Sequence, residues 1–169
     1  MRFLIIFIFL ITNVVAEELP GIKNIVIHKA PKTYDNVIFL DKKDQKININ
    51  EYRGNLLVLN FWATWCEPCK EEMPSLDKLQ ANPELDKIKI FAINIGKENS
   101  DKVNKFFKDF NIKNFEPYFD PPTTLAKMFS LRGVPTSILI NKEGQEFARI
   151  IGSIDFEDKN FVNWIKKYN

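Results

Sequence analysis

The cysteines Cys66 and Cys69 stand where the pattern of a buried strand gives way to that of a helix, and this junction constrains the fold most. Residues 56–61 form an apolar run with the length and character of a strand buried on both faces. From Glu67 the period changes, and apolar residues recur at helical spacing at Met73, Leu76 and Leu79. A strand that leads through a dithiol into a helix indicates an α/β domain.

Two prolines lie within the predicted helix. Pro68 falls in the first turn, where its missing N–H would have had no partner inside the helix. Pro74 falls inside the pattern and predicts a kink rather than an end, because the apolar face continues beyond it. We therefore expect one continuous helix that starts at the dithiol.

The rest of the chain alternates between strand and helix patterns. Residues 88–93 predict a strand, and the next segment predicts an amphipathic helix opened by Ser100 and Asp101. This order implies a right-handed crossover between two parallel strands. Residues 111–122 are rich in turn formers. Beyond them we predict a short helix, a two-stranded hairpin and a closing helix around residues 123–129, 137–151 and 161–165.

A further hairpin is predicted ahead of the buried strand. Residues 37–40 and 47–49 are apolar and flank a polar stretch, which is typical of two strands and their turn. The predicted fold class is therefore α/β. It is a mixed sheet with a parallel core and an antiparallel C-terminal hairpin, covered by helices on both faces, plus an N-terminal hairpin.

The first residues have the layout of an export signal. Arg2 is followed by the apolar residues 3–10, and small residues precede Glu17. We interpret residues 1–16 as a secretory signal peptide cleaved after Ala16, because the apolar run is shorter than the roughly 20 residues of a membrane span. An uncleaved membrane anchor is the alternative. Residues 17–29 are expected to be a loosely structured lead-in, reaching to about residue 33, and residues 30–169 the domain itself.

The charge balance bears on partners. Net charge is +2, from 24 basic and 22 acidic side chains that are interspersed along the chain. A nucleic-acid-binding domain concentrates basic residues on one face, so no nucleic-acid partner is expected. If the chain is exported to the periplasm or another extracytoplasmic compartment, Cys66 and Cys69 work where disulfides persist.

Three interpretations of the Cys-x-x-Cys pair can be compared. A structural disulfide gains stability by closing a long loop, and this loop is very short. Structural zinc takes four Cys or His ligands, and only His28 remains as a further candidate. A redox pair suits the position, because free N–H groups and the helix dipole at a helix start stabilise the Cys66 thiolate. Cys69, one turn further in, is expected to be less exposed and to resolve a mixed disulfide formed by Cys66. No cofactor or metal beyond the redox-active disulfide is expected.

The segment Asn-Phe-Trp-Ala-Thr-Trp-Cys-Glu-Pro-Cys-Lys-Glu-Glu-Met-Pro at residues 60–74 resembles the active-site stretch of the TlpA/ResA-like branch of the thioredoxin superfamily. The resemblance extends from about Ala30 to the C-terminus. Residues 132–137, Arg-Gly-Val-Pro-Thr-Ser, match the second signature of that family, in which the proline peptide bond is cis. Together, and in this order, the two motifs are specific. The resemblance implies a thioredoxin-like fold and a monomer.

The resemblance also assigns roles to single residues. It implies that Pro135 faces the dithiol and exposes the backbone of Val134 to an incoming peptide, although an ordinary turn proline is the alternative. It implies that Glu72 lies close to the dithiol and modulates proton transfer, although a solvated helix carboxylate would look the same in sequence. Trp65 matches the family tryptophan that shields the active site, and a half-buried core aromatic is its alternative. The surface at Trp65, Glu67, Pro68 and Val134 is expected to contact the substrate.

One position departs from ordinary thioredoxins, which carry a buried aspartate where this chain has Asn60. An amide cannot accept a proton from Cys69. The role of base must therefore move elsewhere or be lost, and Glu72 is the candidate. This substitution points to the extracytoplasmic branch of the superfamily.

The resemblance implies a reductant of exported clients, either the haem-site cysteines of apocytochrome c or copper-site cysteines, recharged by a membrane thiol transporter. A disulfide-forming oxidant is one alternative, but such proteins usually place a histidine between the cysteines, where this chain has Glu67 and Pro68. A copper-binding chaperone of thioredoxin fold is another. It would need a histidine, and His28 is expected to be a surface or lightly packed residue of the lead-in. A peroxidase is excluded, because no Thr or Ser lies at the required distance before Cys66.

Overall fold

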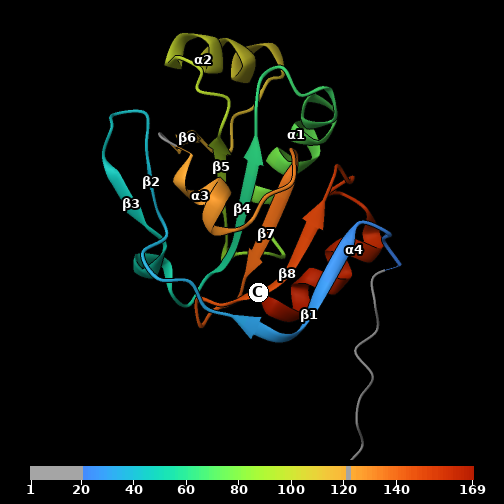
Figure 1. Cartoon of the computed structure of the whole chain (residues 1–169). Helices are drawn as coiled ribbons and strands as arrows, with labels where there is room; N and C mark the ends of the chain where they lie inside the picture. The colour runs from blue at the N-terminus through green and yellow to red at the C-terminus, as the bar shows by residue number, and fades with distance from the viewer. Residues whose placement is uncertain (1–20, 121–122) are drawn as a thin grey trace, which may run out of the picture.

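A computed structural model describes residues 21–120 and 123–169 of the chain (Figure 1), so the predicted signal peptide lies outside the described residues. The strands are β1 (Ile25–Lys32), β2 (Ile38–Leu40), β3 (Lys46–Asn48), β4 (Leu56–Trp62), β5 (Ile88–Asn94), β6 (Pro117–Phe119), β7 (Thr136–Ile140) and β8 (Glu146–Ile151). The helices are α1 (Glu67–Gln80), α2 (Ser100–Asp109), α3 (Thr124–Met128) and α4 (Lys159–Ile165), with 3₁₀ turns η1 (Ile49–Tyr52) and η2 (Lys166–Tyr168).

The described strands form one eight-stranded sheet in the order β1-β8-β7-β4-β5-β6-β2-β3. β4, β5 and β6 are parallel neighbours, whereas β7 and β8 form an antiparallel hairpin beside β4 (Figure 1). The predicted mixed sheet, with its parallel core and its N- and C-terminal hairpins, is confirmed. The N-terminal hairpin of β2 and β3 extends the same sheet, because Leu40 pairs with Phe119 of β6.

β4 lies at the centre of the sheet and is buried along its whole length. Successive side chains of a strand point to opposite faces. Leu56, Val58 and Trp62 therefore pack into one core, with apolar residues of α1, α2 and α4. Leu57 and its neighbours on the other face pack into a second core that includes Leu125 of α3. Helices thus cover both faces, as the sequence predicted.

The active-site helix α1 begins at Glu67, directly after its N-cap Cys66, and runs to Gln80. Pro68 occupies the first turn, where it removes no helical hydrogen bond. The helix continues through Pro74, because Met73, Leu76 and Leu79 remain buried against β4 and β5. The continuous helix predicted from the sequence is confirmed.

One expectation is wrong. Residues 25–32, expected within a loose lead-in, form β1, which pairs antiparallel with β8. Ile25 and Ile27 pack on the first core, and the strand covers the edge that β8 would otherwise expose. The segment 111–120 has the predicted turns and bends, and it also contains the short strand β6, which extends the parallel core beyond β5.

Within the described residues, no helix is both long enough and apolar enough to span a membrane.

Candidate active site

The two cysteines form a disulfide at the start of α1, with their Cα atoms 5.3 Å apart. Cys66 is the N-cap residue, and its Sγ accepts a hydrogen bond from the Cys69 backbone N–H at 3.2 Å. Cys66 is 4% exposed and Cys69 is wholly buried, in the order that the sequence analysis expected. Of the two sulfurs, that of Cys66 is therefore the one that a substrate reaches.

The position of Cys66 favours a thiolate. The first N–H groups of a helix have no partner within it, and the helix dipole adds positive potential there. One of these groups, the Cys69 N–H, already points at the Cys66 sulfur. A reduced Cys66 at such an N-terminus is a nucleophile, and its exchange with an external disulfide needs no other group to start.

The second signature, residues 132–137, comes close to the dithiol through the sheet. β7 pairs with β4 so that Thr136 lies opposite Phe61, which places Pro135 beside Trp62, where β4 ends and the dithiol loop begins. The Val134–Pro135 peptide bond is cis. The Pro135 carbonyl accepts a hydrogen bond from the Gly152 N–H at 2.9 Å, which ties the loop to the end of β8.

The outer surface of the site is formed by Trp65, Glu67 and Pro68, all of which are exposed. Trp65 is 64% exposed, so the alternative that it is a half-buried core aromatic is wrong. The Glu67 carboxylate accepts a hydrogen bond from Lys70 Nζ at 2.7 Å, and both side chains face solvent. Val134 is half-buried between the two cores. Three of these four residues are therefore exposed next to Cys66 in the chain, and Val134 is half-buried.

Glu72 lies three residues after Cys69 and therefore on the same face of α1. It is only 2% exposed, so the alternative of a solvated carboxylate is wrong. Its Oε1 accepts from Asn60 Nδ2 at 2.8 Å, while no described side chain donates to Oε2. Burial raises the pKa of Glu72 to about 8, although the Asn60 amide and the Ile154 backbone both oppose the rise.

Asn60 holds Glu72 in place and links it to the next strand. Its Nδ2 also donates to Ser137 Oγ at 2.9 Å, so β4, β7 and α1 meet at this amide. A pocket of about 290 Å³ lies beside Glu72, lined by Glu71, Glu72, Ser75, Ser153, Ile154 and Asp155. Solvent can therefore come close to the buried Glu72 carboxylate.

A second carboxylate near the dithiol, that of Glu98, was missed in the sequence. It lies between β5 and α2 and accepts hydrogen bonds from the backbone and side chain of Thr64. The only signal in the sequence is that Asn94 ends β5 and Glu98 follows four residues later, where the carboxyl end of β5 adjoins that of β4.

His28 is neither on the surface nor lightly packed, which corrects the expectation for it. Its side chain is 11% exposed, and its Nε2 lies 2.7 Å from a carboxylate oxygen of the wholly buried Glu146. That carboxylate also binds Arg149 and Tyr34, so His28 is part of a polar cluster between β1 and β8. Among the described residues, no group of three or more His, Cys, Asp or Glu side chains could hold a metal ion.

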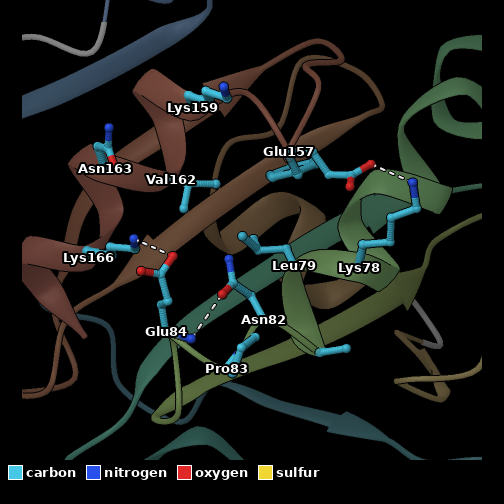
Figure 2. Close-up of a pocket in the computed structure, with 12 residues that line it drawn as sticks. Lys78, Leu79, Asn82, Pro83, Glu84, Glu157, Lys159, Val162, Asn163 and Lys166 are labelled. Carbon is cyan, nitrogen blue, oxygen red and sulfur yellow. Dashed lines mark hydrogen bonds and ion pairs between the residues drawn. The ribbon is translucent and has the colours of Figure 1, made fainter.

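A larger pocket, of about 450 Å³, opens between the C-terminal end of α1 and α4 (Figure 2). Two ion pairs cross its rim: Lys78 with Glu157 at 2.7 Å and Lys166 with Glu84 at 2.5 Å. Lys78 follows Cys66 by twelve residues, or about 18 Å along a helix. The pocket therefore lies apart from the dithiol and contributes nothing to its chemistry.

Comparison with known proteins agrees with this site. Residues 26–145 match the AhpC/TSA family. The chain is 33% identical over 121 residues to the thiol-disulfide oxidoreductase ResA of Bacillus cereus, an alignment that covers 72% of this chain and 69% of the relative. It is 30% identical over 132 residues to ResA of Bacillus subtilis, covering 78% and 73% of the two chains.

Solved structures share the fold. StoA from Bacillus subtilis superposes with a TM-score of 0.62 at 28% identity, over 76% of this chain and 96% of that one. The thiol:disulfide interchange protein DsbE from Chlorobium tepidum superposes with a TM-score of 0.71 at 22% identity, over 82% and 96%. Since the dithiol at the start of α1, the cis proline beside it and these likenesses agree, the chain belongs to the AhpC/TSA family and is a ResA-like thiol–disulfide oxidoreductase of the thioredoxin superfamily.

Proposed function

We propose that the enzyme acts outside the cytoplasm and reduces disulfides in specific exported proteins. The observation that carries this proposal is the dithiol itself, with Cys66 capping α1 and Cys69 buried one turn behind it. The export signal predicted for residues 1–16 supports the location.

The proposed reaction has two exchange steps. The Cys66 thiolate attacks one sulfur of the client disulfide, so that a Cys66–client bond forms and the other client sulfur leaves as a thiolate. Cys69 then loses its proton and attacks the Cys66 sulfur, and the second client sulfur leaves. The client gains two electrons and takes up two protons, and the enzyme ends with the Cys66–Cys69 disulfide that the structure contains.

The residues between the cysteines favour reduction over oxidation. A strongly oxidising dithiol needs its thiolate form stabilised beyond what the helix start provides. Here Glu67 places a carboxylate next to Cys66, and its charge is only partly balanced by Lys70. A negative charge at this position disfavours the thiolate, which makes the disulfide the more stable state and the dithiol the better reductant.

Glu72 is proposed as the group that exchanges a proton with Cys69. Residues three apart on a helix are neighbours, so the carboxyl group lies near the buried thiol. A pKa of about 8 lets the group gain or lose a proton close to neutral pH, as an acid or base of this step requires. The neighbouring pocket at Ser153 and Asp155 would carry the proton to solvent.

The client is proposed to bind across Trp65, Glu67, Pro68 and the backbone of Val134, with Pro135 facing the dithiol. Support comes from the exposure of the first three and from the register that brings Pro135 to the end of β4. The clients we propose are apocytochrome c haem-site cysteines or copper-site cysteines, and the electron donor is a membrane thiol transporter. The enzyme is proposed to act as a monomer.

The test is the equilibrium reduction potential of the Cys66–Cys69 pair in a thiol redox buffer. A value near or below about −250 mV, in the range of thioredoxin, supports the reductant. A value near about −120 mV, in the range of the strong periplasmic oxidants, overturns it and makes disulfide formation the working activity.

Two variants connect the potential to the mechanism. Cys69→Ser should trap a mixed disulfide between Cys66 and the client, visible as a band that reducing agent removes, whereas Cys66→Ser should trap none. Glu72→Gln should shift the pH dependence of disulfide exchange, and Glu71→Gln, an exposed neighbour, should not. Identical pH profiles for both Glu variants would rule out the proton role of Glu72.

A further inference from the structure

The loop that leads into the dithiol is held from one side by a single carboxylate, that of Glu98. The backbone N–H of Thr64 donates to Glu98 Oε2 at 2.8 Å, and the Thr64 hydroxyl donates to Oε1. Thr64 is followed directly by the exposed Trp65 and then by Cys66. Glu98 therefore fixes the backbone two residues before the nucleophile, from a position 34 residues away in sequence.

Glu98 is itself fixed by two further donors. Asn94 Nδ2 donates to Oε2 at 2.9 Å, and Lys102 Nζ donates to Oε1 at 2.5 Å. Its side chain is only 4% exposed. Although burial raises it, the hydrogen bonds from Lys102, Thr64 and Asn94 together lower the pKa of Glu98 to about 2, so the group is ionised at neutral pH. Charge-assisted hydrogen bonds of this kind are about twice as strong as neutral ones.

Gly96 provides the space for the carboxylate. A Cβ at this position would lie 2.7 Å from Glu98 Oε2, closer than real Cβ contacts come. The Gly96 backbone is outside the left-handed region, so its own conformation does not require glycine. Its N–H donates to Asn94 Oδ1 at 3.0 Å, and the opposite end of the same amide holds Glu98. The end of β5 is thus built around this one carboxylate.

The nucleophile depends on the loop that Glu98 holds. The Cys66 sulfur accepts a hydrogen bond from the Cys69 N–H because Cys66 is the N-cap residue of α1. The Cys66 N–H in turn donates to the Ala63 carbonyl at 3.2 Å. Both contacts require the turn at residues 63–66 to keep its shape, and Thr64 is inside that turn. We propose that Glu98 is a positioning residue of the active site, which holds Thr64 so that Trp65 and the Cys66 sulfur are presented to the client. This inference rests on the function proposed above.

Asp77 offers a matched control. It is 7% exposed, and its carboxylate accepts from the backbone N–H groups of Lys113 and Asn114 at 2.9 and 2.7 Å. Like Glu98 it holds a loop by accepting hydrogen bonds from one segment, here three from Lys113 and Asn114, but that loop follows α2 and is not part of the dithiol site. A purely structural role for Glu98 predicts that the Glu98 and Asp77 variants behave alike.

The experiment compares Glu98→Ala, Glu98→Gln and Asp77→Ala with the wild-type enzyme. The probe is a synthetic peptide with one intramolecular disulfide, reduced by the dithiol form under second-order conditions. Glu98→Ala should lower the rate constant between about tenfold and a hundredfold, the loss that a misplacement of about 1 Å causes. Glu98→Gln keeps an oxygen that accepts the Thr64 N–H and should restore most of the rate. Asp77→Ala should leave the rate close to that of the wild type.

A spectroscopic signature separates positioning from stability. Trp65 is 64% exposed, whereas Trp62 and Trp164 are 0% and 2% exposed, so fast fluorescence depolarisation reports mainly on Trp65. Glu98→Ala should add a nanosecond component to the anisotropy decay, because the freed loop moves on that timescale. Gly96→Ala should add it too, since the new Cβ displaces the carboxylate without removing a polar group.

The outcomes decide between the proposals. An unchanged decay in Glu98→Ala and Gly96→Ala, or equal rate losses in Glu98→Ala and Asp77→Ala, would overturn the positioning role. If the wild-type dithiol fails to reduce the peptide, the proposed function falls, and the anisotropy decay still decides whether Glu98 holds the loop.

Discussion

Two carboxylates flank the active-site loop, Glu72 on α1 and Glu98 ahead of α2, and both side chains are withdrawn from solvent. Glu72 is 2% exposed, and the side chain of Glu98 is 4% exposed. Yet the pKa of Glu72 is raised to about 8 and that of Glu98 is lowered to about 2. Burial raises the pKa of both carboxyl groups, so the difference between them comes from their hydrogen-bond partners.

The difference lies in the donors. Glu72 receives one side-chain hydrogen bond, from Asn60, and the Ile154 backbone lowers its pKa to a lesser extent. Glu98 receives four, one of them from a lysine. Desolvation raises the pKa of a buried carboxyl group unless hydrogen bonds and a nearby positive charge stabilise the carboxylate. The sparsely bonded group is free to exchange a proton, whereas the fully bonded one can only hold a loop.

The largest effect should come from a third carboxylate, Glu146. It tests whether hydrogen-bond donors around a buried carboxylate determine its contribution to the free energy of unfolding. It is wholly buried, and Arg149 donates to it from Nε at 2.6 Å and from a second guanidinium nitrogen at 2.9 Å. Glu146→Ala should lower the free energy of unfolding by about 3–5 kcal/mol, because Arg149 is left without its partner. Urea unfolding measures this.

Glu143 is the control for Glu146, since it lies exposed in the same hairpin. Glu143→Ala should change the unfolding free energy by less than about 0.5 kcal/mol. Equal losses in the two variants would mean that the buried donors contribute nothing and would break the comparison between Glu72 and Glu98.

Glu72→Gln should change how stability depends on pH. The folded-state pKa is raised from 4.5 to about 8, so the stability due to the protonated carboxyl is fully present below pH 4.5 and is lost as pH rises through 8. The variant should not show this decline, and above pH 8 it should exceed the wild type, at about 1.4 kcal/mol for each pKa unit. Thermal melts at a series of pH values measure this.

Glu71→Gln is the control for the pH dependence of stability, because Glu71 is the exposed neighbour of Glu72 on α1. It should keep the decline of the wild type between pH 4.5 and 8. A Glu72→Gln curve that declines just as steeply would show that Glu72 stays ionised throughout, and the contrast with Glu98 would disappear.

The parts of the site that local sequence encodes were predicted. Cys66 and Cys69 are separated by two residues at a strand–helix junction. A continuous apolar run marks β4, and apolar residues at helical spacing mark α1, without reference to the rest of the chain. The resemblance of residues 132–137 to a family signature located the cis bond before Pro135. These features depend on neighbours a few residues apart, which a pattern can record.

The parts that depend on distant pairs were missed. The contact of Glu98 with Thr64 spans 34 residues, and that of His28 with Glu146 spans 118. Glu98 is marked only by its place after β5, and His28 by nothing beside it in the sequence, so local sequence does not show that either side chain is buried. β1 was missed for the same reason, because it is a strand only through its pairing with β8. Pairing at long range is decided by the assembled sheet and not by local propensity.

Asn94→Ala should have an intermediate effect. It tests how much one neutral donor to Glu98 contributes to stability. The change removes a donor to Glu98 and the acceptor of the Gly96 N–H. A hydrogen bond to a charged group contributes about 1.5–3 kcal/mol, so the unfolding free energy at neutral pH should fall by roughly that amount. Asn82→Ala, which removes only the acceptor of the Glu84 N–H in an exposed loop, should lose less.

Asn94→Ala should also change how stability depends on pH in the acid range. Because the folded pKa of Glu98 is lowered from 4.5 to about 2, its stabilisation is present above pH 4.5 and is lost as pH falls through 2. With one donor fewer, the folded pKa of Glu98 rises in Asn94→Ala, and the acid-induced loss should begin at a higher pH. An acid transition that coincides with that of the wild type would show that Asn94 does not help to hold the charge.

The smallest effect should come from Lys102→Met, which removes the remaining positive charge from Glu98. Lys102 is 57% exposed, and a pair with one end in water contributes about 0.5 kcal/mol or less. Its matched control is Lys105→Met, because Lys105 pairs with Asp109 in the same helix with both ends exposed. If the nearly buried anion strengthens its pair, Lys102→Met should lose more stability than Lys105→Met, and the excess should survive in 1 M salt, where the screening length is about 3 Å. If the stability losses of both variants vanish in salt, Thr64 and Asn94 alone stabilise the charge of Glu98. The contrast with Glu72 would then come only from the larger number of neutral hydrogen-bond donors around Glu98.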